Sequence, residues 1–202
     1  MANQVHYWHQ DRLCLQTGSQ LPTAQSLMTK QGLEQQMARL VAEPQANQLL
    51  TALQQAYQQG YEQQASNEFE LKGVAFAGIG DPLLHLDLLA QVLPSFKAER
   101  HGVPISLVSY GLLPSDQIAN RVQQLLALEV ERLELYFPAA EPQTYLQRAQ
   151  PLAQGFAELC QLILQASEQG LAVSCFADAP AAEQAQLRSL ALDLGARSFH
   201  RL

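Results

Sequence analysis

Short apolar segments alternate with longer segments of helical periodicity along most of the chain. The short segments predict six strands, at residues 12–17, 71–77, 104–110, 132–137, 171–176 and 197–202. The longer segments predict helices at 24–64, 83–99, from 114 onward, 142–169 and 181–194. Six strands separated by helices predict a parallel sheet with right-handed crossovers. A doubly wound sheet and a partial barrel both satisfy this pattern.

Proline and glycine mark the predicted helix ends. Pro44 divides the Gln-rich segment 24–64 into two helices, because proline breaks a helix interior and is tolerated at a helix start. Gly195 is a predicted C-cap. Apolar residues within the Gln-rich segment recur at helical spacing, so we expect it to be folded with a solvated Gln face.

The composition is typical of globular proteins and limits the classes of partner that the chain is expected to bind. The length of 202 residues, with 48% hydrophobic and 15% charged residues, predicts a single domain over 1–202. A net charge of -7 gives no electrostatic footprint for nucleic acid, so we expect a small-molecule or protein partner of unidentified kind. We expect no membrane span and no signal peptide, because neither apolar pattern is visible, which makes the cytoplasm the default location.

Three cysteines, Cys14, Cys160 and Cys175, are too few and too scattered for a disulfide framework. We expect three free thiols, mostly buried in the core.

Four segments carry a resemblance to a known family. Residues 76–84 (FAGIGDPLL) follow a strand, open a helix and resemble the Gly-Gly-Glu-Pro segment of radical SAM enzymes. Residues 108–112 occupy the place of that family's strand ending in Asn-Thr-Asn-Gly-Leu, 135–145 resemble its fourth-strand segment, and 192–201 resemble its closing helix-Gly-strand segment. Together they look most like the small TatD-linked radical SAM proteins. The resemblance implies an α/β fold, an open partial TIM barrel of six βα units with a parallel sheet.

The first loop lacks the residues on which the family's chemistry depends. A [4Fe–4S] cluster needs three thiolates in a C-x₃-C-x₂-C loop after the first strand, because soft sulfur ligands hold such clusters. The corresponding positions of this sequence are Gln20, Ala24 and Leu27. We therefore expect no [4Fe–4S] cluster, no other resident cofactor and no radical chemistry.

The resemblance also suggests residues that would contact S-adenosylmethionine. These candidates are Gly78, Gly80, Asp81 and Ser109. A structural alternative stands beside this interpretation. Glycines before Pro82 suit a strand-to-helix turn, and Asp81 is a natural N-cap. The residual binding of S-adenosylmethionine without its cleavage is therefore one open hypothesis.

Strand alternation points to candidate catalytic residues in the barrel lumen. Glu134 and Tyr136 alternate with leucines, so they share one face of their strand and should face the lumen. Glu134 is expected to pair with Arg201 or His200, or to meet a ligand. An enzyme with non-radical chemistry would use Glu134, Tyr136, Asp81 or His200.

Other positions indicate that the cofactor pocket has changed. The family carries Asn at the positions of Val108, Tyr110 and Pro138, and the side chain of Tyr110 would fill ligand space. Polar groups that would recognise a ligand are therefore missing. The first hypothesis is a pseudoenzyme, a non-catalytic binding or accessory protein. Non-radical catalysis and residual S-adenosylmethionine binding are the alternatives.

Overall fold

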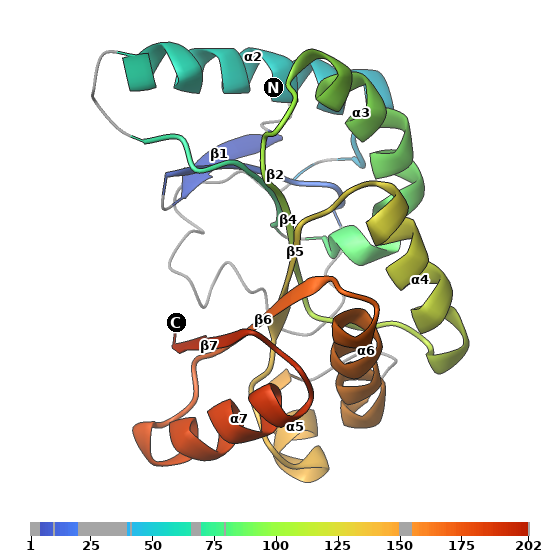
Figure 1. Cartoon of the computed structure of the whole chain (residues 1–202), viewed down its shortest axis with the longest axis vertical. Helices are drawn as coiled ribbons and strands as arrows, with labels where there is room; N and C mark the ends of the chain where they lie inside the picture. Colours follow the sequence, from blue (N-terminus) through green and yellow to red (C-terminus); the bar gives the residue numbers. More distant parts are fainter. Residues whose placement is uncertain are drawn as a thin grey trace.

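The computed structural model describes residues 5–9, 11–19, 40, 42–65, 70–78, 80–149 and 155–201. Within them, one seven-stranded sheet follows the order of the chain (Figure 1). Its strands are β1 (His6–His9), β2 (Arg12–Leu15), β3 (Val74–Phe76), β4 (Ile105–Ser109), β5 (Arg132–Tyr136), β6 (Ala172–Ala177) and β7 (Ser198–Arg201).

Sequential strand order distinguishes between the two folds that the pattern allowed. Strands β2 to β7 pair in parallel, each with the next along the chain. A doubly wound sheet reverses its strand order at a switch point, and this sheet does not. The predicted α/β fold, an open partial barrel with a parallel sheet, is confirmed.

The predicted count of six strands missed β1. This strand pairs antiparallel with β2, with Trp8 opposite Leu13. Asp11, in the connection, has the left-handed φ of 62°, which suits a tight reversal. The strand was missed because its four residues include two histidines and give only a weak apolar pattern. The segment forms a strand because it pairs with β2.

Helices connect the parallel strands. They are α2 (Ala46–Ala65), the short 3₁₀ helix η1 (Pro82–His85), α3 (Leu86–Glu99), α4 (Ser115–Ala127), α5 (Pro142–Ala149), α6 (Phe156–Glu168) and α7 (Ala181–Asp193). The predicted helix start after Pro44 agrees with α2. Residues 24–39 and 41 of the Gln-rich segment lie outside the described residues.

The single helix predicted over 142–169 is wrong, because the structure has two helices there. Gly155 is the N-cap of α6, and its backbone N–H donates to the Glu158 side chain at 3.2 Å. The sequence carries a signal for this break in Gly155, because glycine is a poor helix former and its backbone here is extended.

The core lies between the sheet and its helices. Figure 1 shows α3, α4 and α6 side by side along one face of the sheet, with β1 and β7 at its two separate edges. Alternate strand residues face these helices, and Leu13, Leu107, Leu133 and Val173 are fully buried there. The other face of the sheet forms the lumen.

An ion pair across the lumen shows how strongly the sheet curves. Arg12 of β2 contacts Glu134 of β5. Three strand spacings separate these strands, about 14 Å in a flat sheet. The side chains can meet only because the sheet curls around them. Among the described residues, no helix is both long and apolar enough to cross a membrane.

Candidate functional site

The residues predicted as a site lie at different levels of the partial barrel. Gly78, Gly80, Asp81 and Ser109 lie where β3 and β4 end, and Tyr136 ends β5. Glu134 lies lower on β5, and His200 lies on the edge strand β7. The positions aligned with cluster ligands, Gln20, Ala24 and Leu27, lie outside the described residues.

Asp81 is the most buried acid of this set, at 1% exposed. Its carboxylate accepts hydrogen bonds from the Ser109 hydroxyl at 2.7 and 2.9 Å, from the Leu83 N–H at 3.0 Å and from the Tyr110 N–H at 3.0 Å. Burial raises its pKa to about 6, against the lowering effect of these hydrogen bonds. The predicted N-cap role is therefore present, and the carboxylate also ties η1 to the end of β4.

Gly78 and Gly80 are required by close approach. Gly78 has a φ of 131°, and a Cβ there would lie 2.8 Å from the Gln16 side chain. A Cβ on Gly80 would lie 2.6 Å from the backbone of Gly18. The loops after β2 and β3 pack against each other without space for side chains, which explains both glycines structurally.

Three aromatic rings pack against one another in the lumen near the carboxyl ends of the strands. We call Tyr110, Tyr136 and Phe176 the aromatic layer. The ring centroids of Tyr110 and Tyr136 are 6.4 Å apart at 78°, and those of Tyr136 and Phe176 are 5.9 Å apart. All three side chains are buried. The expectation that Tyr110 occupies ligand space is consistent with this packing.

Tyr136 also makes a polar contact at its outer end. Its hydroxyl donates to the Asp178 carboxylate at 2.7 Å. Burial and this hydrogen bond raise the pKa of Tyr136, so the phenol stays protonated at neutral pH. A protonated phenol that already donates to a carboxylate is poorly prepared to act as a general base.

Glu134 faces the lumen, as strand alternation predicted, but its partner is different. It pairs with Arg12, and neither Arg201 nor His200 contacts it among the described residues. Strand β7 is an edge strand, and the exposed His200 lies within 2.9 Å of the Ser198 hydroxyl instead. The predicted pairing was wrong because it placed β7, rather than β2, opposite β5.

The cysteines do not converge on one point in the fold. Cys14 faces the lumen on β2, whereas Cys175 faces the helices on β6 and Cys160 lies on α6. Burial raises the thiol pKa of Cys14 and Cys160 to about 11 and that of Cys175 to about 12. Within the described ranges, no group of three His, Cys, Asp or Glu residues could hold a metal ion.

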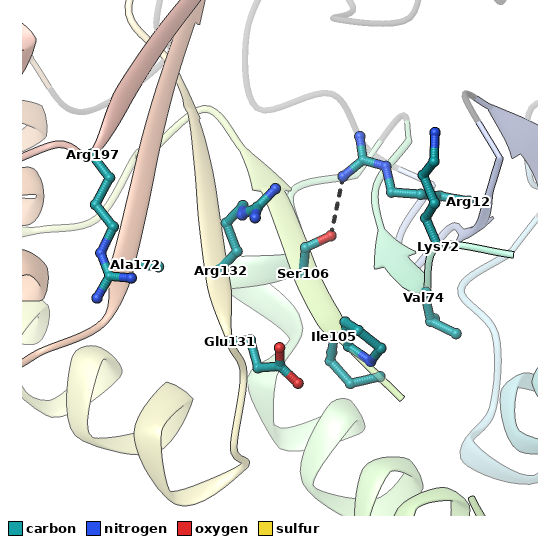
Figure 2. Close-up of a pocket in the computed structure, with 11 residues that line it drawn as sticks. Arg12, Lys72, Val74, Ile105, Ser106, Glu131, Arg132, Ala172 and Arg197 are labelled. Carbon is teal, nitrogen blue, oxygen red and sulfur yellow. Dashed lines mark hydrogen bonds between the residues drawn. The ribbon is translucent and has the colours of Figure 1, made fainter. Parts of the chain in front are cut away.

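The sequence prediction missed a cavity at the opposite end of the lumen, where the parallel strands begin. Its volume is about 320 Å³. Figure 2 shows Arg12, Ser106 and Arg132 around it, and the Arg12 guanidinium donates to the Ser106 hydroxyl at 3.3 Å. Lys72 and Arg197 also line it. Polar residues at the starts of three strands were the available signal, but only the curvature brings them together.

Comparison with known proteins adds little to this description. No protein-family model matches the sequence, and no curated protein matches it significantly. A number of solved structures are similar at low identity, and two of them serve as examples. One is a candidate phosphonomutase from Burkholderia cenocepacia J2315, with 11% identity, 71% of this chain and 64% of that chain covered, and a TM-score of 0.45.

The other is an enolase from Gibberella zeae PH-1, solved with magnesium, formate and sulfate. It has 14% identity, 79% of this chain and 43% of that chain covered, and a TM-score of 0.34. The chain spans less than two thirds of the length of either protein. Since both TM-scores lie below 0.5, we transfer neither activity nor ligand from them.

Proposed function

We propose that this protein is a radical SAM-like barrel that binds a partner or small molecule and performs no radical chemistry. The observation that carries the proposal is the carboxyl-terminal mouth of the lumen, where barrels of this architecture usually hold their ligands. There the buried rings of the aromatic layer contact one another, and the Asp81 carboxylate accepts hydrogen bonds from within the protein.

The candidate polar residues argue against catalysis, because each already has a partner within the protein. Glu134 is paired with Arg12, and Tyr136 donates to Asp178. A general acid or base must reach the proton it transfers. Each of these groups would first have to give up a structural contact, at a cost of about 1–3 kcal/mol for a buried polar group left without a partner.

The thiols support a cluster-free protein. Iron–sulfur ligation requires thiolates, and a thiol with a raised pKa is almost entirely protonated at neutral pH. All three cysteines have raised pKa values because they are buried. Their positions on β2, α6 and β6 add a geometric obstacle to a shared cluster.

Anaerobic iron–sulfur reconstitution tests the absence of radical chemistry. The wild-type protein is compared with the triple variant Cys14→Ser, Cys160→Ser and Cys175→Ser, and both are followed by iron content and visible absorption. We expect the same low iron content in both proteins. A stoichiometric cluster that disappears in the triple variant would contradict the proposal. The three single variants serve the same purpose if the triple variant does not fold.

Calorimetric titration with S-adenosylmethionine tests the main alternative. We expect no saturable heat, because the aromatic layer occupies the space and the carboxylate of Asp81 is already hydrogen-bonded. Saturable micromolar binding would favour residual S-adenosylmethionine recognition. Product analysis by mass spectrometry would then show whether the bound molecule remains intact.

A further inference from the structure

We propose that the cavity at the amino-terminal mouth of the lumen binds a small metabolite through a doubly charged oxyanion, a phosphate monoester or a dicarboxylate. The cavity measures about 320 Å³, near the lower limit of small-molecule pockets. It lies where the strands begin, opposite the mouth that barrels of this type usually use. The inference goes beyond the proposed function, which concerns the other mouth.

The charge of the cavity differs from that of the whole protein. The chain has a net charge of -7 and 12 Lys and Arg residues. Four of these line this one cavity, together with a single acid, Glu131. The lining cations are Arg12, Lys72, Arg132 and Arg197. A third of the Lys and Arg residues therefore line one cavity, although the protein as a whole is acidic. This concentration of positive charge produces a local electrostatic potential that attracts anions.

The four cations differ in how far they are neutralised. Arg12 is paired with Glu134, and Lys72 is 3.1 Å from the exposed Asp11. Neither Arg132 nor Arg197 has a carboxylate within 4.0 Å in the described part of the chain. Two positive charges at the cavity therefore have no carboxylate counter-ion among the described residues.

The arrangement of the side chains places the anion beside Arg132. Arg132 and Ser106 are register partners on β5 and β4, and both face the lumen. Figure 2 shows the Arg132 side chain on the same side of the sheet as Ser106 and Arg12, while the Arg197 guanidinium points away from them. The predicted contacts are therefore the guanidinium groups of Arg132 and Arg12 and the Ser106 hydroxyl.

The chemistry of these groups selects the ligand class. Guanidinium groups present planar pairs of N–H donors that match two oxygens of a phosphate or carboxylate. The Ser106 hydroxyl already accepts from Arg12, which leaves its own O–H free to donate to a third oxygen. A volume of about 320 Å³ leaves room for a small carbon skeleton attached to the anion.

Thermal unfolding with added anions tests the proposal. Inorganic phosphate and malonate are titrated separately at constant ionic strength, with chloride as the balancing ion. We expect a saturable increase in Tm for the wild-type protein, because a ligand that binds only the folded state stabilises it. Arg132→Gln should weaken the affinity about tenfold or more.

Arg188→Gln is the matched control, because Arg188 is exposed on α7 and does not line the cavity. It makes the same charge change and should leave the affinity unchanged. A preference for phosphate or for malonate identifies the source of the oxyanion, and either one supports the site. An unchanged Tm with both anions, or an equal increase in wild type and Arg132→Gln, would overturn the proposal.

These results are independent of the tests for a cluster or S-adenosylmethionine. The cysteine variants and the cofactor titration examine the carboxyl-terminal mouth and the thiols. The anion titration examines residues at the strand starts. A protein that failed one set of experiments could still satisfy the other.

Discussion

The two mouths of the lumen use their polar residues in opposite ways. At the carboxyl-terminal mouth, Asp81 accepts from Ser109, Leu83 and Tyr110, and aromatic rings close the space below. At the amino-terminal mouth, Arg132 has no carboxylate partner among the described residues and borders an open cavity. The polar groups of the first mouth hold the fold together, whereas the second presents the cations on which the proposed anion site depends.

Residues proposed from a resemblance need not be the ones whose polar groups remain available to a ligand. Asp81 and Ser109 occupy the expected positions and contact each other, so their polarity is satisfied inside the protein. Arg132 belongs to no motif, yet it lacks an internal acidic partner in the described structure. An exposed guanidinium beside a cavity can contact an external ligand directly, whereas a buried carboxylate that is already hydrogen-bonded would first have to give up its contacts.

The largest expected effect tests the structural role of the carboxyl-terminal mouth. Asp81→Ala removes the acceptor of one hydroxyl and two N–H groups, and buried groups without partners cost about 1–3 kcal/mol each. We expect the free energy of unfolding to fall by about 3 kcal/mol or more, measured by urea denaturation. Asp116→Ala, at the exposed start of α4, should cost less than about 1 kcal/mol. Similar losses in both variants would contradict the structural role of Asp81.

The pH dependence of stability provides a second test of the structural role of Asp81. Burial raises the pKa of Asp81 from 3.8 to about 6, so the folded state binds this proton more tightly than the unfolded state. The contribution of Asp81 to stability is therefore complete below pH 3.8 and is lost as the pH rises through 6. From pH 6 to pH 4, the stability advantage of wild type over Asp81→Asn should grow by about 2 kcal/mol. Denaturation curves at several pH values measure this gap, and a constant gap would contradict the assignment.

The ion pair at the other mouth should affect stability and binding in opposite directions. Glu134→Gln leaves the half-buried Arg12 without its counter-ion, so we expect the free energy of unfolding to fall by about 1–3 kcal/mol. The same change makes the cavity more positive, so phosphate should bind more tightly than to wild type. Calorimetry and denaturation on one preparation test both effects.

A matched control for this ion pair is Glu131→Gln, which removes a cavity carboxylate that forms no ion pair among the described residues. Its stability should change by less than about 0.5 kcal/mol. Glu134 has two opposing effects on an anion, because it orients Arg12 and also repels the anion by its charge. If Glu134→Gln weakens phosphate binding, the orientation of Arg12 is the larger of the two effects.

The smallest expected effect concerns the edge of the aromatic layer. Tyr136→Phe keeps the ring packing and removes the hydroxyl that donates to Asp178. We expect a loss of about 0.5–1.5 kcal/mol in the free energy of unfolding. Tyr61→Phe, at a position 56% exposed, should have almost no effect. A much larger loss for Tyr136→Phe would show that this hydroxyl supports more of the mouth than one hydrogen bond.

Much of the fold was readable from the sequence because it depends on local patterns. The six parallel strands follow from short apolar segments, and the lumenal direction of Glu134 follows from strand alternation. The cap at Asp81 and the left-handed Gly195, with a φ of 97°, follow from residue chemistry. Two elements were predicted wrongly, namely β1 and the break between α5 and α6. In both places the apolar pattern is short or interrupted, so contacts with neighbouring elements determine the structure.

By itself, the sequence determined the alternation of strands and helices, the residues that face the helices, and the absence of cysteine from residues 15–159. Only the tertiary structure decided which polar residues meet. Arg12 and Glu134 are 122 positions apart, and Arg12 and Ser106 are 94 apart. These contacts depend on how strongly the sheet curls, which is a collective result of packing helices against one face, and no local pattern encodes it.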